Sequence, residues 1–293
     1  MIWMNESLQP TGATGFGHMI SDESLWELHD FAAGIGLGAR AFDHDRYTLP
    51  EGFLRPALEH GARPVGEGEL AARLAGSGLG MPSGARRPVP SDRELLKRWP
   101  LAPDIGKRVL ARWREPHRRY HDASHLAEVL DRLESLAGEV PRPVRLAAWY
   151  HDAVYDGVPG QDEEASAALA DSELRGVVSV GERAEVARLI RLTIDHSPDQ
   201  ADQAGALLCD ADLAILAAVP GRYHVSLRDI RYEYRALGRR DFLEGRLALV
   251  EGFIRAQLFH TAQGLRQWQE SARSNLEAER FRLASGSWLP DPC

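Results

Sequence analysis

Apolar residues recur at intervals of three and four from about residue 91 onward, which is the spacing of one face of an α-helix. Helices are predicted over 105–113, 123–136, 141–151, the segment after Asp162, the segment before His196, 204–219 and, as two or three long helices, 225–283. The segment 204–219 is apolar on nearly all sides, so we expect it at the centre of a helical core. No alternating strand pattern occurs in this half, which predicts an all-α domain.

Residues 1 to about 80 follow a different pattern. Residues 1–4 predict a short strand, and a loop rich in Gly and Thr follows at 11–17. Helices are predicted over 21–33, 50–60 and 69–74. The glycines of GIGLG follow a helix instead of joining a strand to a helix, so they do not predict a phosphate-binding loop. We expect a small α/β domain here.

A segment rich in Gly, Pro and Ser, GSGLGMPSGARRPVPSD, separates the two patterns and predicts a linker. The chain of 293 residues is longer than one average domain. The predicted organisation is a small α/β domain at 1–80, a linker at 81–92 and an all-α domain at 93–293. The predicted fold class is therefore mainly α.

Composition narrows the functional classes. The formal net charge of −8 argues against non-specific binding of nucleic acid, although a small phosphorylated substrate responds to local charge and stays open. No apolar run has the length of a membrane span and no basic-then-apolar leader begins the chain, which predicts a cytoplasmic protein without a membrane partner. The cysteines, Cys209 in an apolar run and Cys293, do not predict a disulfide scaffold. The sequence leaves the oligomeric state open.

A histidine and an aspartate, His151 and Asp152, stand at the end of an apolar segment, LAAWYHDAVYD. His151 shares one helical face with Val144, Ala147 and Ala148, so its side chain is expected to point inward. A buried imidazole beside a carboxylate is unfavourable without a partner, and a metal ion bound by both groups removes that cost. The alternative is a histidine at a helix end that pairs only with its own aspartate.

Further histidines and aspartates occur in the same predicted domain. His121 and His125 stand four residues apart, and His125 borders an apolar stripe. Asp212 falls within the apolar stripe of LLCDADLAIL and needs a compensating charge, whereas Asp210 projects elsewhere. His196 ends another helix. Singly, each has a structural explanation, such as a surface histidine pair or an aspartate that accepts an arginine.

Together these side chains form a set of nitrogen and oxygen donors without a thiolate. Such a set suits a divalent ion in an octahedral shell, Mn²⁺, Mg²⁺, Fe²⁺, Co²⁺ or Ni²⁺, more than structural zinc. The sequence does not decide the identity or the number of ions.

The order His125, then His151 with Asp152, then Asp212 resembles that of the HD superfamily of metal-dependent phosphohydrolases. The resemblance extends from about residue 91 to the C-terminus and is closest to a bacterial group of predicted HD phosphohydrolases. The shared pieces are RRYHDASH, WYHDAVYD, DEEASA, LTIDH, CDADLAIL, IRYEY and SARSNLEAE. The resemblance implies an HD-type all-α fold.

It also implies an enzyme, a hydrolase of phosphoric esters that acts on a nucleotide or another small phosphoester through a metal-activated water. The implied metal ligands are His125, His151, Asp152 and Asp212, with Asp152 bridging if a second ion joins. The motif Tyr-His-x-x-x-His of related cyclic-nucleotide phosphodiesterases makes His121 the general acid. Asp152, Glu163 and His196 are further catalytic candidates, the last two as outer ligands or substrate contacts.

Some features leave alternatives open. The group usually has Asn at Asp162 and Lys at Asp195, so the roles around these positions are undecided. Lys107, Arg118 and Arg119 could attract an anionic substrate or form a solvated helix face. A nucleotide-sensing regulatory HD protein without turnover is one alternative function. A di-iron oxygenase of the HD fold is another, which the additional His196 keeps open.

The N-terminal pieces GHMISD, ELHDFAAGIGL and EHGARPV, together with Tyr47, resemble a short uncharacterised bacterial domain. That domain usually has His and Asp on either side of the tyrosine, where this chain has Arg46 and Thr48. The resemblance implies a domain boundary and no chemistry. Five side chains could form a polar site here, or act as helix caps and loop residues: His18, Asp22, His29, His44 and Asp45.

Overall fold

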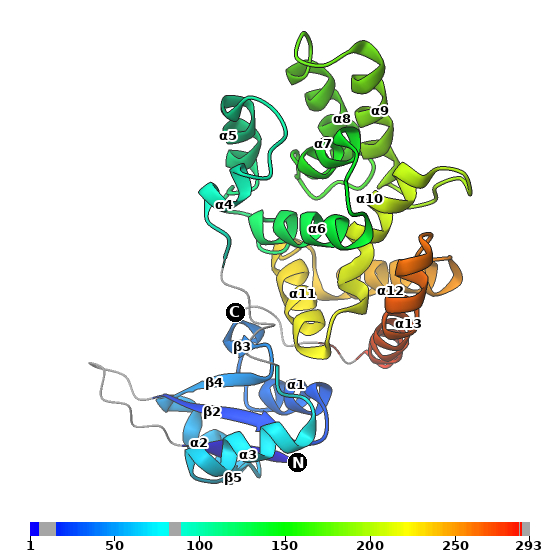
Figure 1. Cartoon of the computed structure of the whole chain (residues 1–293). Coiled ribbons are helices and arrows are strands. Elements are labelled where there is room, and N and C mark those ends of the chain that lie inside the picture. Colours follow the sequence, from blue (N-terminus) through cyan, green and yellow to red (C-terminus); the bar gives the residue numbers. More distant parts are fainter. Residues whose placement is uncertain (6–15, 82–88, 287, 289–293) are drawn as a thin grey trace. The chain divides into compact units, whose positions relative to one another are not determined.

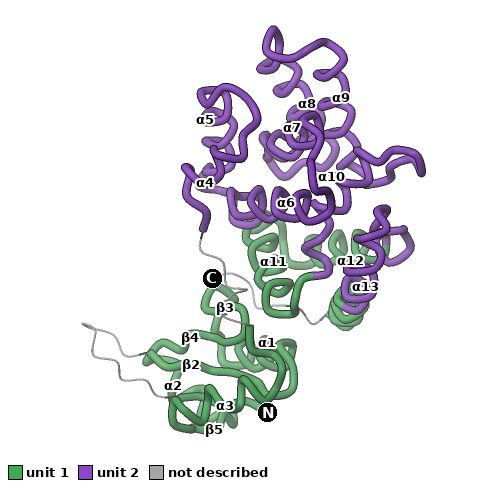
Figure 2. The backbone as a smooth tube through the Cα atoms, viewed as in Figure 1, with its two compact units in different colours: residues 1–86, 218–251, 275–293 green, residues 87–217, 252–274 purple. Residues whose placement is uncertain are grey.

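The computed structural model describes residues 1–5, 16–81, 89–286 and 288. Most of the predicted loop at 11–17, the middle of the predicted linker and Cys293 lie outside the described residues. The chain divides by its internal contacts into two compact units, which Figure 2 colours separately. Unit 1 comprises 1–86, 218–251 and 275–293, and unit 2 comprises 87–217 and 252–274. The predicted boundaries 1–80, 81–92 and 93–293 stay a prediction, because compact units need not coincide with units that fold alone.

Unit 1 contains a five-stranded mixed sheet with the strand order β3-β4-β2-β1-β5 (Figure 1). Its strands are β1 (Ile2–Asn5), β2 (Phe16–Ser21), β3 (Phe42–Asp43), β4 (Arg46–Pro50) and β5 (Arg63–Pro64). Only β5 runs parallel to its neighbour, β1. Met19 of β2 lies opposite Met4 on one side and Tyr47 on the other, and this row is fully buried. Of these strands only β1 was predicted from the sequence. β3 and β5 have two residues each, too few for an alternating pattern, whereas β2 and β4 were overlooked.

Three helices of unit 1 accompany the sheet: α1 (Leu25–Gly34), α2 (Glu51–Glu59) and α3 (Glu67–Ser77). The first begins later than predicted because Ser24 is its N-cap and accepts a hydrogen bond from the backbone N–H of Glu27. Ser21, at which the predicted helix begins, ends β2 instead. The unit also includes α11 (Pro220–Glu233), which packs against α1 and β3.

Unit 2 is built from helices, and no strand occurs among its described residues. They are α4 (Asp92–Leu96), α5 (Pro103–Arg112), α6 (Ala123–Leu136), α7 (Arg142–Tyr150), α8 (Gln161–Glu173), α9 (Val180–Leu192) and α10 (Gln203–Leu213). Two further helices, α12 (Arg239–Arg255) and α13 (Ala262–Ala284), contribute residues to both units. The predicted fold class, mainly α with a small N-terminal α/β part, is confirmed.

Helix α10 occupies the centre of unit 2, as its apolar sequence predicts. It packs against α6, α7 and α9 (Figure 1), and Leu208 and Cys209 are completely buried. Cys209 is a free thiol. Since His125 lies on α6 and His151 directly follows α7, this packing brings the candidate ligands toward one another.

Among the described residues, no single helix is both long and apolar enough to cross a membrane. The segments Gln203–Ala217 and Pro220–Glu233 meet the criterion only when taken together as a bent pair.

Candidate metal centre

His125 enters the centre from the first turn of α6. Asp122 caps this helix, and its carboxylate accepts the backbone N–H groups of Ser124 at 2.7 Å and His125 at 3.3 Å. The imidazole of His125 is therefore fixed close to a rigid helix start and is almost fully buried. His121 lies before the cap, so the two histidines do not share one helical face, although their ring centroids are only 5.8 Å apart.

His151 enters from the C-terminal end of α7. Its backbone N–H donates to the carbonyl of Ala147 at 2.8 Å, and its ring Nδ1 donates to the carbonyl of Ala148 at 2.9 Å. A carbonyl oxygen only accepts, so Nδ1 carries the hydrogen and Nε2 faces the opposite way. The ring of Trp113 packs 5.4 Å from the imidazole and holds it in this orientation.

Two carboxylates meet the histidine nitrogens. Asp212 Oδ1, from α10, lies 3.1 Å from His125 Nε2 and 3.5 Å from His151 Nε2. Asp152 Oδ2 lies 3.2 Å from His151 Nε2 and 3.7 Å from His125 Nε2. The ligand atoms of His125, His151 and Asp212 lie within 4.8 Å of one another, so this buried group can hold a metal ion.

The charges of the centre call for a cation. His151 Nε2 is buried and has no hydrogen-bond partner in the described structure. In the neutral tautomer this atom directs a lone pair at two carboxylates, which is repulsive unless a positive charge lies between them. A proton on Nε2 can be shared between only two of these atoms. A metal ion can be bound by all four, which are the Nε2 atoms of the two histidines and one oxygen of each carboxylate. The donor set fits a divalent metal ion.

The same charges shift the titration of each group. Burial alone would lower the pKa of His151, but the carboxylates of Asp152 and Asp212 outweigh it and raise that pKa well above its ordinary value. Burial alone would raise the pKa of Asp152 and of Asp212, but the charge of His151 outweighs it and holds both below the ordinary range. Both carboxylates are therefore ionised at neutral pH.

Two further histidines flank the carboxylates. His196 Nε2 lies 2.9 Å from Asp212 Oδ2, and the backbone of His196 has a left-handed φ of 53°. The ring of His121 stacks on Tyr155 with centroids 4.1 Å apart, and the charge of His121 helps to lower the pKa of Asp152. The structure thus brings both predicted histidines next to the centre. Tyr155 was overlooked, although its place in WYHDAVYD was a signal.

Glu163 has another contact. Its carboxylate accepts the backbone N–H of Gly160 at 2.6 Å at the start of α8, and among the described residues it forms no ion pair with the four ligand candidates. Its neighbour Asp162 accepts the backbone N–H groups of residues 156–158 and so fixes the loop after the centre. These contacts give both residues a loop-holding part, and the predicted catalytic role of Glu163 stays a prediction.

Arg118, a candidate for attracting anions, is buried and used internally. Its guanidinium donates to the backbone carbonyls of His121 at 3.1 Å, Asp152 at 2.6 Å and Ala153 at 3.2 Å. Arg118 thereby ties the segment before α6 to the segment after α7. A second of these cations, Lys107, is exposed and pairs with Asp104 at 3.2 Å. The buried Arg118 therefore does not form a solvated helix face, whereas the exposed Lys107 fits that alternative.

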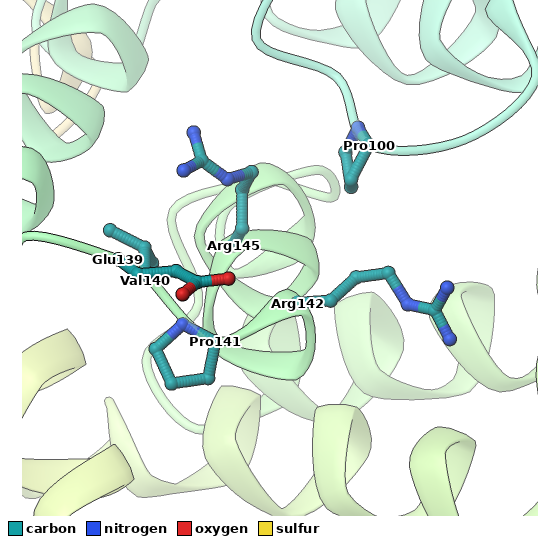
Figure 3. A pocket seen from close by; sticks show the side chains of 6 residues that line it. All are labelled: Pro100, Glu139, Val140, Pro141, Arg142 and Arg145. Atoms are coloured by element: carbon teal, nitrogen blue, oxygen red, sulfur yellow. The ribbon is translucent and has the colours of Figure 1, made fainter.

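A surface cavity of about 440 Å³ lies elsewhere in unit 2 (Figure 3). It is lined by Pro100, Glu139, Val140, Pro141, Arg142 and Arg145. Figure 3 shows the two guanidinium groups pointing to different sides, and they pair with Glu182 and Glu134. The cavity lies at the N-terminal end of α7, about 13 Å of helix from His151, so it is separate from the candidate metal centre.

Three of the five polar residues of the N-terminal patch form hydrogen bonds with different partners. Asp22 accepts the indole N–H of Trp3, and Asp45 accepts the backbone N–H of Met81. His29 is completely buried, with Nδ1 2.7 Å from the hydroxyl of Tyr47 and Nε2 2.9 Å from Nδ1 of His224 on α11. For Asp22 and Asp45 these contacts favour the structural alternative, whereas His29 lies inside α1 and belongs to a buried cluster with Tyr47 and His224.

Residues 2–77 match a known family, described as "Protein of unknown function (DUF4031)". The match covers β1 to β5 and α1 to α3 and ends where α3 ends. It supports the expectation of an uncharacterised N-terminal domain and assigns no chemistry. No curated protein and no solved structure matches the chain.

Proposed function

We propose that the centre of unit 2 binds a divalent metal ion and that the protein is a metal-dependent phosphohydrolase of the HD type. The observation that carries the proposal is the convergence of two imidazole nitrogens and two carboxylate oxygens. All four groups accept positive charge, three helices and their ends position them, and His151 Nε2 has no other partner in the described structure. The motif order in the sequence supports the same assignment.

His125, His151, Asp152 and Asp212 would hold the ion. When bound, it would polarise a phosphoryl oxygen and lower the pKa of a coordinated water. Three contacts keep these ligands in place: Asp122 caps α6, the Ala148 carbonyl accepts from His151, and Arg118 donates to the Asp152 carbonyl. Little rearrangement is therefore needed when the ion binds. The lack of a thiolate favours Mn²⁺, Mg²⁺, Fe²⁺, Co²⁺ or Ni²⁺.

His121 is the proposed proton donor to the leaving oxygen. It lies beside the centre without being among the four ligand candidates, and its stacking on Tyr155 restricts the orientation of the ring. An imidazole suits this work because its ordinary pKa is near neutrality. The proposed substrate is a small phosphoester, and nucleotides are the first class to test.

The test compares metal content and hydrolysis in the purified full chain. His151→Ala and Asp212→Asn should lose bound metal by elemental analysis and lose phosphate release from nucleotides and from a chromogenic phosphodiester. His60→Ala, at an exposed histidine of unit 1, is the matched control and should retain both. Full metal content in His151→Ala would refute the ligand set. If the wild-type chain contains metal but hydrolyses no phosphoester, the result would instead indicate a binding protein without turnover.

A di-iron oxygenase is the second candidate, and one contact favours it. His196 lies on Asp212 Oδ2 while His125 lies on Asp212 Oδ1, so this carboxylate could bridge two ions. Two irons per chain, with substrate-dependent oxygen consumption and no phosphate release, would establish this alternative over hydrolysis.

A further inference from the structure

The helix that carries Asp212 also carries a second buried aspartate, Asp210. Residues two positions apart on an α-helix point about 200° away from each other around the helix axis. The carboxylates of Asp210 and Asp212 therefore point to nearly opposite sides of α10. Asp212 faces the candidate metal centre. Asp210 faces the segment that leads into α13, which is fifty residues further along the chain.

Asp210 binds this segment tightly. Its carboxylate accepts the backbone N–H of His260 at 2.7 Å, the backbone N–H of Thr261 at 2.9 Å and the hydroxyl of Thr261 at 2.6 Å. A Cβ on Gly264 would lie 2.3 Å from Asp210 Oδ2, so the close approach requires glycine. The adjacent Phe259 is fully buried. The backbone around residue 260 is thus anchored without any help from the His260 side chain.

The side chain of His260 reaches in the other direction, toward the metal centre. Its Nε2 lies 3.2 Å from the backbone carbonyl of His196, and because a carbonyl accepts, Nε2 is the donor. His196 has a left-handed φ of 53°, which residues other than glycine rarely adopt. This backbone conformation therefore depends on contacts that stabilise it. The ring of His196 in turn meets Asp212 Oδ2 at 2.9 Å.

These contacts form a continuous chain of hydrogen bonds that begins and ends on α10. It runs from Asp210 to the backbone of His260, through its imidazole to the carbonyl of His196, and through that ring to Asp212. We infer that His260 is a positioning residue of the metal centre. By holding His196 on one oxygen of Asp212, it leaves the other oxygen directed at His125 and His151. This inference rests on the proposed metal-binding function.

Partners of this kind typically change metal affinity by about 10-fold to 100-fold when removed. His260→Ala should therefore weaken binding of Mn²⁺ to the full chain by about that factor, measured by calorimetry, and change the Mn²⁺ electron paramagnetic resonance spectrum. His260→Gln keeps an N–H donor near the same place and should retain most of the affinity. His260→Asn is too short to reach His196 and should behave like His260→Ala.

A double-mutant cycle separates positioning from a general effect on packing. If His260 acts through His196, then His196→Ala with His260→Ala should bind Mn²⁺ no more weakly than His196→Ala alone. Additive losses would overturn the inference, as would wild-type affinity in His260→Ala. If His260→Ala does not fold, equal affinities in the Gln and Asn variants would overturn it. Mn²⁺ binding that survives His151→Ala would refute the proposed metal centre itself, which is a different result.

Discussion

His151 Nε2 lies 3.2 Å from Asp152 Oδ2, although the tautomer fixed by the Ala148 carbonyl leaves no hydrogen on Nε2 unless the ring is charged. Two atoms that both accept positive charge are thus held together in a buried place. The folding of α7 enforces this contact, since the ring and the carboxylate belong to neighbouring residues at its end. Such a contact becomes favourable when a cation lies between the two groups.

Metal binding should release protons and should weaken as pH falls. The pKa of His151 is raised well above its ordinary value by the two carboxylates, so without metal the ring holds a proton at neutral pH. A coordinating nitrogen must be unprotonated, so about one proton should leave for each ion bound. Calorimetry at pH 7 in buffers of different ionisation enthalpy measures this number. A release of zero, with an affinity independent of pH, would contradict the assignment of His151 as a ligand.

His121→Gln should reduce turnover without removing the metal. General acids typically contribute about 10²-fold to 10⁴-fold to a rate, so kcat should fall by that order while bound metal is unchanged. Tyr155→Leu removes the stacked ring and should give a smaller loss in the same direction. Elemental analysis and steady-state kinetics of the two variants are the measurements. Loss of metal in His121→Gln would instead make His121 a ligand.

The buried histidine pair of unit 1 should make folding sensitive to acid. Burial holds the pKa of His29 well below its ordinary value and lowers the pKa of His224 to about 3, and the charge of Arg282 adds to both shifts. Both rings are neutral in the folded chain but charge in the unfolded chain below its pKa of about 6.5, so stability present above that pH is lost as pH falls.

For each of these histidines the loss at pH 5 should be about 2 kcal/mol. Urea unfolding between pH 5 and pH 8 measures it. The double variant with His29→Gln and His224→Gln should show a much smaller dependence on pH, whereas His60→Gln, at an exposed site, should not. An unchanged dependence in the double variant would show that other groups carry the acid sensitivity.

Two glycines in helices should respond oppositely to alanine. Gly264→Ala places a Cβ 2.3 Å from the Asp210 carboxylate and should destabilise the protein by about 1–3 kcal/mol. Gly252 lies in α12 with nothing within 4 Å of an added Cβ, so Gly252→Ala should stabilise by about 0.5–1 kcal/mol. Unfolding of both variants by urea checks the signs. Equal effects would mean that Asp210 can move, and the chain of hydrogen bonds through His260 would then not hold His196 in a fixed position.

Helical periodicity was sufficient to predict that the side chains of His151 and Asp212 point toward the core, because a period of 3.6 residues fixes which positions share a face. The same periodicity predicted a helix over 123–136, which is α6 in the structure, and so placed His121 before that helix. It left Asp210 without a partner. That partner lies fifty residues away, and His224 lies 195 residues from His29, so no local pattern contains either contact.

Whether the four proposed ligand side chains bind a metal ion can be measured in a crystal of the full chain grown with Mn²⁺, with diffraction recorded at the manganese absorption edge. We expect an anomalous peak between His125 Nε2, His151 Nε2 and the carboxylates of Asp152 and Asp212. A peak bound by other residues, or no peak among these four side chains at a saturating concentration of Mn²⁺, would contradict the proposed metal centre.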